Sequence, residues 1–394
     1  MTSRFHALRE YCETTRQKEA FNSLVTTQNI TQSANQLGVS RQGMQSIIAS
    51  VEKKARLRGW DPSMDLTHPA GAGMNLKRVS TNYNSDGDIN QQWVIYEPEK
   101  EAQDLAYRAY IEGLLQNLKP VKATKPKKLD YTSELASAIV FGDAHLGMIA
   151  HAVETLGAEH DLDTALADIK SAIDYLVDCS PAQEEGYFIN VGDFTHTNDF
   201  SNTTPGHGNM MDVGQRHSQT MRAAGAIIRY CIARMLTKFK TVRVINARGN
   251  HDYDAAFALN MFLEGIYENE PRVEVLQNDS KFNFIEFGNT LIGVNHGDKI
   301  NALRLAGVMT RMQSEAWGRT KYRRWFLGHI HHKVVQEHET GVTLESFHTL
   351  APIDAWHAES GYGAESRVTM ITFHREFGEV NRMSPSLDML RALR

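Results

Sequence analysis

The sequence predicts an α/β fold that follows a small helical module. Five short runs of β-branched or aromatic residues have the length of strands, and each ends in Gly or polar residues. These runs cover residues 136–141, 187–191, 242–246, 291–294 and 325–327. Ahead of them, residues 31–48 read as two helices joined by a tight turn.

Each of the five runs is followed by a short island rich in Asp, His and Asn. The islands are Gly142-Asp143-Ala144-His145, Gly192-Asp193, Gly249-Asn250-His251-Asp252, His296-Gly297-Asp298 and Gly328-His329-Ile330-His331. Because ligands bind outside the carboxyl ends of the strands in an open α/β sheet, we expect the islands to converge. Their carboxylates, amide and imidazoles suit two adjacent divalent metals, and such pairs hydrolyse phosphate esters.

The ordered set resembles the five motifs of the calcineurin-like metallophosphoesterase superfamily, over about residues 136–332. The resemblance implies a four-layer α-β-β-α sandwich and places His251 beside the scissile phosphate. It also assigns the metal ligands, with Asp193 bridging both ions: Asp143, His145 and His331 on one, and Asn250, His296 and His329 on the other. We expect Mn at both positions, although mixed nitrogen and oxygen ligands also accept Fe, Zn or Ni.

The residue types agree with these roles. A carboxylate such as Asp193 has two acceptor oxygens and can bridge two ions. His251 could stabilise the transition state or protonate the leaving alkoxide, since a His titrates near neutral pH. Arg248 is a candidate phosphate contact through its guanidinium group, with an ordinary surface position as the alternative. Asp252 is expected to cap the local backbone or to support an imidazole.

The residues after Gly192-Asp193 narrow the branch of the superfamily. Protein phosphatases of this class carry a further Arg-Gly pair there, whereas this chain reads Phe-Thr-His-Thr-Asn. The spacing from Asp193 to His196 instead resembles the double-strand-break repair nucleases, which place a second catalytic His at this point. A solvated loop position is the alternative for His196. The polar, Gly-rich insertion 198–215 is expected to be a lid, a binding loop or disordered.

Composition limits the class of protein. Of 394 residues, 41% are hydrophobic, as in globular proteins, and neither a run of 18 apolar residues nor a signal-peptide core is present. We therefore expect a cytoplasmic protein, in the host cytoplasm if a phage encodes it, with no membrane partner. The three cysteines, Cys12, Cys179 and Cys231, lack metal-binding spacing and are expected to be reduced.

The N-terminal third is the basic part of the chain. Residues 1–130 carry 18 Lys and Arg against 14 Asp and Glu, while the remainder carries 24 against 33. Residues 31–48 resemble a helix-turn-helix, with small Ala34 at the helix crossing, Gly38 in the turn and Ser40 as an N-cap. The second helix would turn a set of polar and basic residues toward DNA: Ser40, Arg41, Gln42, Gln45, Ser46, Lys53 and Lys54. The alternative is a helical module that packs on a partner protein or dimerises.

Three segments follow from this division. Residues 1–97 would hold the helix-turn-helix and a hairpin over 76–83 and 92–96, which forms a wing or only covers the helices. Residues 98–130 would be a helix, centred on 105–118, and a Lys- and Pro-rich linker that acts as a solvated tether. Residues 131–394 would be the phosphoesterase domain, with strands at 343–347 and 368–374 completing its second sheet.

The leading functional hypothesis is a two-metal phosphodiesterase that acts on DNA, a nuclease held on its substrate by the N-terminal module. The combination of modules resembles phosphoesterases of phages and prophages. An alternative is a nucleotide or small-phosphoester hydrolase whose N-terminal module binds protein or its own operator. A third is a DNA-binding regulator with an inactive phosphoesterase fold. A homodimer is compatible with each of them.

Overall fold

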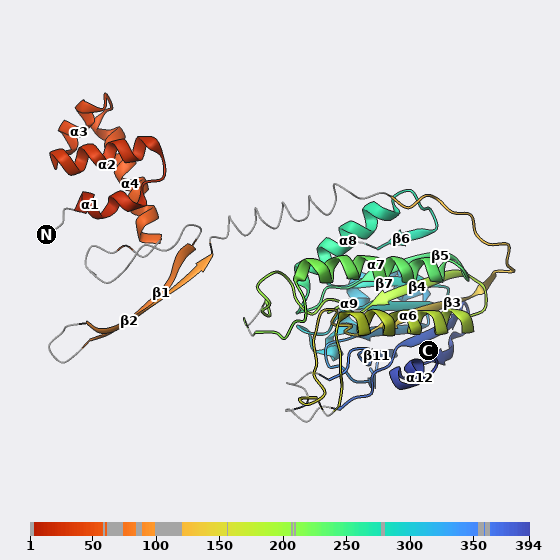
Figure 1. Ribbon diagram of the computed structural model, residues 1–394. Coiled ribbons are helices and arrows are strands. Elements are labelled where there is room, and N and C mark those ends of the chain that lie inside the picture. The colour runs from red at the N-terminus through yellow and green to blue at the C-terminus, as the bar shows by residue number, and fades with distance from the viewer. Residues whose placement is uncertain are drawn as a thin grey trace. The chain divides into compact units, whose positions relative to one another are not determined.

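The computed structural model describes residues 4–57, 60, 74–83, 89–98, 120–155, 157–205, 208, 210–276, 280–353, 358 and 363–394. The chain divides into two compact units, Met1–Gly113 and Leu114–Arg394 (Figure 1). The helix expected at 105–118 and the hairpin turn expected at 84–88 lie outside the described residues.

Helices build the beginning of the first unit. They are α1 (Arg4–Leu8), the 3-10 turn η1 (Arg9–Tyr11), α2 (Thr15–Thr27), α3 (Ile30–Gln36) and α4 (Arg41–Leu57). A capping box starts α2, because Thr14 Oγ1 accepts from the backbone N–H of Gln17 while the Gln17 side chain accepts from that of Thr14. The helices enclose a core of their own that includes Leu8, Phe21, Leu24, Ala34, Met44 and Val51.

The turn between α3 and α4 lies where the sequence predicted it. Gly38 adopts a left-handed backbone with φ of 62°, which a glycine reaches without steric cost. Ser40 Oγ accepts a hydrogen bond from the N–H of Gly43 at 3.0 Å and so caps the start of α4. The contact of these helices with DNA stays a prediction.

A hairpin follows the helices in the first unit. Strand β1 (Met74–Tyr83) pairs antiparallel with β2 (Ile89–Pro98), and the register shifts between Leu76 and Arg78. Trp93 and Ile95 on β2 are 50% and 49% exposed, so this ribbon leaves apolar side chains uncovered. The hairpin is confirmed, and its role as a wing stays a prediction.

Two sheets form the middle of the second unit. The six-stranded sheet has the order β13-β12-β3-β4-β5-β6 and the five-stranded sheet the order β10-β11-β9-β8-β7. All five expected strands are present as β3 (Thr132–Phe141), β4 (Gln183–Asn190), β5 (Phe239–Asn246), β8 (Thr290–Val294) and β9 (Tyr322–Leu327). The others are β6 (Val273–Val275), β7 (Asn283–Phe287), β10 (Val334–Glu337), β11 (Val342–Ser346), β12 (Thr369–His374) and β13 (Gly378–Met383).

Helices cover both outer faces of the sheets, which gives the four layers that the sequence predicted. On the six-stranded sheet lie α6 (Leu162–Cys179), α7 (His217–Met235) and α8 (Tyr253–Tyr267), with α12 (Leu387–Ala392) against α6 (Figure 1). On the five-stranded sheet lie η2 (Ala302–Arg304), α9 (Leu305–Met312) and α10 (Ser314–Arg319), packed on Trp325. Between the sheets, the core includes Val140, Ile189, Ile245, Ile292, Phe326 and Phe373.

The last strands correct the predicted topology. The sequence placed residues 368–374 in the second sheet, but β12 pairs antiparallel with β3 and brings β13 with it into the first sheet. Thr372 Oγ1 lies 2.8 Å from Ser137 Oγ on β3, while Ile371 and Phe373 fill the core between the sheets. A sequence pattern that alternates buried and exposed residues cannot tell which edge of which sheet the strand joins.

The start of the expected tether is bound to the second unit. The N–H of Val121 donates to the carbonyl of Ile266 at 2.7 Å, and Thr124 donates to Glu270 through both its N–H, at 2.8 Å, and its Oγ1, at 2.5 Å. Arg272 donates in turn to Thr124 Oγ1 at 3.2 Å. Residues 121–124 are therefore held along α8 and β6 rather than solvated as expected, although the lysines at 122, 125, 127 and 128 are exposed.

The cysteines are free, as the sequence predicted. Cys12 and Cys231 are buried and Cys179 is exposed. Burial raises the pKa of the Cys12 and Cys231 thiols, which keeps them protonated and unreactive. Among the described helices, none has the length and apolar content needed to cross a membrane.

His160 is a buried histidine outside the predicted ligand set. It is 4% exposed, and neither ring nitrogen has a hydrogen-bond partner among the described residues. Burial, with a smaller contribution from Arg391, lowers the pKa of His160 to about 4, against the opposing effect of Asp168. The neutral ring is therefore the folded form at neutral pH, and protonation favours the unfolded chain.

We expect His160 to make the second unit acid-sensitive. The unfolded chain takes up this proton near pH 6.5 and the folded chain near pH 4, so stability is complete above pH 6.5 and falls as the pH drops toward 4. His160→Leu should remove about 2 kcal/mol of the loss between pH 7 and pH 5, measured by urea unfolding at each pH. The exposed His151→Leu is the matched control, and an equal acid slope in both variants would contradict the prediction.

Candidate metal centre

The five islands meet at the carboxyl ends of β3, β4, β5, β8 and β9. Backbone hydrogen bonds join neighbouring islands: the N–H of His145 donates to the carbonyl of Asp193 at 3.0 Å, and that of Gly328 donates to His296 at 3.0 Å. The strand ends therefore bring residues separated by nearly two hundred positions to one place, as the sequence predicted.

Five of the predicted ligands have an unusual backbone. Apart from glycine, the described residues of the second unit with positive φ are Asn202 and the ligands Asp143, His145, Asp193, His329 and His331, at 31° to 72°. A left-handed conformation costs a residue with a side chain about 1 to 3 kcal/mol and is found where surrounding structure enforces it. Strain thus gathers at this centre, which is typical of a functional site.

Two glycines are required because the loops approach one another closely. A Cβ atom on Gly249 would lie 1.8 Å from Asp193 Oδ1, and one on Gly328 would lie 2.7 Å from Asp143 Oδ2. Any larger residue would push these carboxylates away. The glycines that precede Asn250 and His329 are thus part of the geometry of the centre.

The first predicted ligand group is assembled. His145 Nε2 and His331 Nε2 lie 3.1 Å apart, and His331 Nε2 lies 3.7 Å from Asp143 Oδ1. The ligand atoms of all three residues lie within 4.8 Å of one another. Two ligands about 2.0 to 2.2 Å from a common ion stand at comparable separations, so this group fits a divalent metal.

The second predicted group surrounds His296. Its Nε2 lies 3.1 Å from Asp193 Oδ2 and 2.9 Å from Asn250 Oδ1, while its Nδ1 lies 3.1 Å from the carbonyl of Val191. A carbonyl partner places the proton on Nδ1 and turns Nε2 toward the ligands, the arrangement that metal-binding imidazoles adopt. The ring of His329 packs edge-on against His296, with centroids 5.2 Å apart.

The carboxylates are buried and oppose one another electrostatically. Burial raises the pKa of Asp143 to about 7, and the neighbouring Asp193 adds to the effect. Burial opposes ionisation of Asp193 as well, but the charge of His296 outweighs it and holds the Asp193 pKa below its usual range. For His296, burial would lower the pKa, yet Asp193 and Asp143 raise it to about 10. The donors thus need added positive charge, and two divalent cations fit them.

His196 and His251 lie beside the first ligand group. His196 is 5% exposed, its Nδ1 is 3.2 Å from His145 Nδ1, and its ring stacks on that of His251 with centroids 5.6 Å apart. The N–H of His251 donates to Asp193 Oδ1 at 2.8 Å, and His251 Nδ1 lies 3.2 Å from the carbonyl of His196. His196 is thus buried in the centre, and the alternative of a solvated loop position is wrong.

Asp252 caps the local backbone, which is one of the two roles that the sequence predicted for it. It is buried and accepts from the N–H of Gly249 at 2.9 Å and of Thr195 at 3.2 Å. Burial, reinforced by Asp193, raises the Asp252 pKa to about 7. These bonds tie the loop after β5 to the loop after β4. The charge of Asp252 also helps to raise the pKa of the His296 imidazole.

Two positioning residues were missed by sequence reasoning. Thr349 follows β11, and its Oγ1 donates to the carbonyl of Asp143 at 2.7 Å, which holds the strained backbone of that ligand. Asn198 caps α8, because its Oδ1 accepts from the N–H of Asp254 at 2.6 Å. Thr349 lies in no motif, and Asn198 only ends the segment after Asp193, so these contacts become visible only in the folded chain.

The insertion after β4 is partly tied down. Thr203 and Met210 form a β-bridge, Val213 bridges to Met148, and the N–H of Met211 donates to the carbonyl of Asn202 at 3.0 Å. Residues 206, 207 and 209 lie outside the described structure. The described residues of the insertion therefore form an ordered loop, and a role as a lid stays a prediction.

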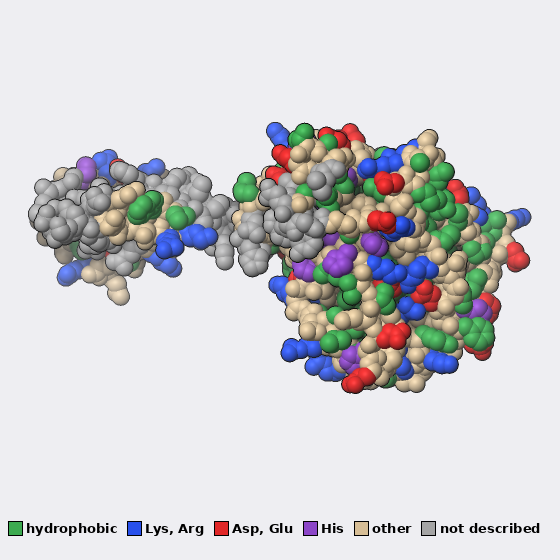
Figure 2. All heavy atoms as spheres, turned by 90° about the horizontal axis from the view of Figure 1, so that it is seen from below, with side chains coloured by type: hydrophobic (Ala, Val, Ile, Leu, Met, Phe, Trp, Pro, Cys, Tyr) green, Lys and Arg blue, Asp and Glu red, His purple; other side chains and the backbone are tan. Residues whose placement is uncertain are grey.

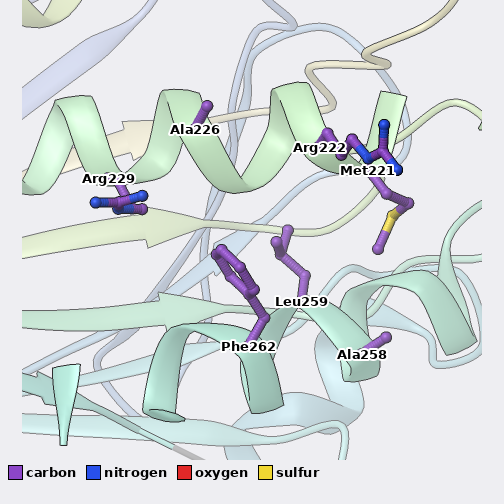
Figure 3. A pocket seen from close by; sticks show the side chains of 7 residues that line it. All are labelled: Met221, Arg222, Ala226, Arg229, Ala258, Leu259 and Phe262. Carbon is purple, nitrogen blue, oxygen red and sulfur yellow. The ribbon is translucent and has the colours of Figure 1, made fainter. Parts of the chain in front are cut away.

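A cavity of about 140 Å³ lies between α7 and α8 (Figure 3). Met221, Leu259 and Phe262 face one another across it, and its lining includes no carboxylate or imidazole. A Cβ atom on Gly225 would meet the Phe262 ring at 2.8 Å, so the helices are in close contact beside the cavity. It is a gap in helix packing and not the site of the chemistry.

A comparison with known protein families agrees with this geometry. Residues 137–365 match the family described as calcineurin-like phosphoesterase. A predicted phosphoesterase of known structure from Streptococcus pneumoniae is 12% identical, with 65% of this chain and 99% of that chain covered and a TM-score of 0.26. A single mutant of Vps29 from Entamoeba histolytica is 13% identical, with 64% and 98% covered and a TM-score of 0.26. The comparison with curated proteins found no match.

We expect Thr349 to support metal binding through Asp143. Thr349→Val removes the hydroxyl that holds the Asp143 carbonyl and should weaken Mn²⁺ binding about tenfold or more, whereas Thr349→Ser keeps the donor and should bind nearly as wild type. Titration calorimetry with Mn²⁺ measures the affinities. Equal affinity of the Val and Ser variants would show that the hydroxyl does not support the ligand.

Proposed function

This chain belongs to the calcineurin-like phosphoesterase family, and we propose that it is a two-metal phosphodiesterase that cleaves DNA. Metal-dependent hydrolysis of a phosphoester follows from the family and from the His and Asp groups that can hold metals. What we propose beyond this is that the substrate is a phosphodiester and that this diester belongs to DNA. The observation that carries this proposal is a second His, His196, which is buried against His145 and His251. It lies in the segment after Asp193 where protein phosphatases of this class carry an Arg-Gly pair, which this chain lacks.

Two bound divalent cations would polarise the phosphoryl oxygens and make hydroxide available near neutral pH. Asp143, His145 and His331 would hold one of them, Asn250, His296 and His329 the other, with Asp193 between. The carbonyl of His196 holds a proton on His251 Nδ1, so His251 would act as the general acid in its imidazolium form, in which Nε2 carries the second proton and gives it to the leaving oxygen. His196 is the proposed second catalytic His, and its contact with His145 and His251 supports that role.

The first unit supports DNA as the substrate. Arg41, Gln42, Gln45, Ser46 and Lys53 are exposed on α4, and Ser40 caps it. Such side chains contact base edges and phosphates when a helix lies in the major groove. Lys54 belongs to the same proposed surface, although its ammonium group pairs with Glu13 and would exchange that partner for a phosphate. Arg248 is proposed as a phosphate contact in the second unit.

A second candidate is a nucleotide or small-phosphoester hydrolase whose first unit binds protein or an operator. The acidic excess after residue 130, 33 Asp and Glu against 24 Lys and Arg, favours it, because a long polyanion is repelled by such a domain. An inactive regulator is disfavoured, since every residue of the expected ligand set is present in the sequence and its Asp and His groups include clusters that could hold a metal.

We expect Mn²⁺-dependent cleavage of DNA that is lost in Asp193→Asn and falls at least 100-fold in His251→Ala. Supercoiled and single-stranded DNA would be assayed on gels beside a small aryl phosphodiester. His151→Ala, at an exposed His outside the predicted ligand set, is the control that should keep full activity. Cleavage of the aryl ester alone would favour the second candidate, and DNA binding without hydrolysis with any divalent metal would favour the regulator.

We also expect DNA affinity to fall with salt, because Lys and Arg release counterions from phosphates. Lys53→Gln should lower the slope of log affinity against log salt by about one. Lys18→Gln removes an exposed charge from α2 and should leave the slope unchanged. Fluorescence anisotropy of a labelled duplex without divalent metal gives both slopes, and identical slopes for wild type and Lys53→Gln argue against contact through α4.

A further inference from the structure

Three side chains form a cationic ledge beside the metal centre, which we define as Arg248, Tyr253 and Lys281. The guanidinium carbon of Arg248 lies 4.8 Å from the centroid of the Tyr253 ring, and Lys281 Nζ lies 5.3 Å from it. Arg248 Nη1 also lies 3.4 Å from the Tyr253 hydroxyl. Two cations from separate parts of the chain thus share one aromatic ring that is 39% exposed.

The ledge is built onto the loops that carry the second ligand group. Arg248 directly precedes Gly249, which touches Asp193. Lys281 Nζ pairs with Asp298 at 3.1 Å, and its carbonyl accepts from Asn295 Nδ2 at 2.9 Å, so the residues on either side of His296 and Gly297 hold it. The ledge therefore lies between the loops that follow β5 and β8, next to Asn250 and His296.

The charges of the ledge are placed to receive an anion. Lys281 Nζ contacts both carboxylate oxygens of Asp298, whose side chain is 4% exposed, while the Lys281 side chain is 22% exposed and so can also be reached from solvent. An arginine stacked on a ring keeps its N–H groups in the plane of the guanidinium, where they can bind a phosphate in a forked geometry. Figure 2 shows Lys and Arg side chains close to His side chains on the face of the second unit that it displays.

We propose that the Arg248–Tyr253–Lys281 ledge binds the phosphate that neighbours the scissile phosphate in a nucleic acid strand. The inference rests on the proposed function and names what distinguishes its substrate: a second phosphate one nucleotide away. The metal ligands serve the scissile group, and the ledge offsets the charge of the next group along the strand.

Three thymidine dinucleotides that differ by one phosphate test the ledge. One has only the diester phosphate, one adds a 5′-phosphate and one adds a 3′-phosphate. With Mn²⁺, wild type should cleave one of the phosphorylated forms about tenfold or more better in kcat/KM, mostly through KM, as expected for a charge-assisted contact. The preferred form also shows on which side of the scissile bond the ledge lies.

Arg248→Gln and Lys281→Met should each bring the ratio of kcat/KM between the phosphorylated and unphosphorylated forms toward one. Lys281→Met should keep the wild-type rate on the unphosphorylated dinucleotide, which also shows that this variant folds. Arg248→Lys should keep a partial preference, because it retains the charge and loses the forked geometry. Arg311→Gln, which removes an exposed Arg from α9, is the matched control and should keep the full preference.

The outcomes separate the ledge from the proposed function. If wild type cleaves the dinucleotides and the preference persists in both Arg248→Gln and Lys281→Met, the ledge is overturned and the phosphodiesterase stands. If wild type discriminates among none of the three, the ledge is likewise overturned. If wild type cleaves neither the dinucleotides nor DNA with any divalent metal, the proposed function fails and the ledge fails with it.

Discussion

Two carboxylates buried side by side are the constraint on which the catalytic unit depends. Asp143 and Asp193 are 0% and 1% exposed, and burial of charge is unfavourable unless cations and hydrogen bonds offset it. The N–H groups of His329 and His251 donate to these carboxylates, and His296 lies against Asp193. These donors offset only part of the negative charge of Asp143 and Asp193. The remaining negative charge is the reason why the centre suits divalent metals.

The surrounding fold keeps these carboxylates in place. Bonds between loops do much of this: Asp252 joins the loops after β4 and β5, and Asn190 Nδ2 donates to Asn246 Oδ1 at 2.8 Å where the two strands end. Thr349 reaches the centre from beyond β11. The predicted ligand residues keep their left-handed backbone conformation because the two sheets pack over an apolar core and leave the loops little freedom to relax.

The two units carry different parts of the proposed activity. The catalytic unit is acidic overall. The cations that we place at the edge of the metal centre are two, Arg248 and Lys281. Such a surface suits the recognition of a single phosphate at a fixed position relative to the scissile phosphate. Affinity for a long polyanion then has to come from a separate surface, and we propose α4 of the first unit, where Arg41 and Lys53 are exposed.

The sequence by itself determined the five strands, the ligands that follow them and the helices around Gly38, because each depends on neighbouring residues. Strand length, a glycine turn and Ser40 as a cap are local signals, and the ligand islands are contiguous. Only the tertiary structure decided that β12 joins β3, that Thr124 binds Glu270 and that His196 is buried. The ledge of Tyr253 and Lys281 likewise depends on contacts between distant segments, for which no periodicity or spacing in the chain carries a signal.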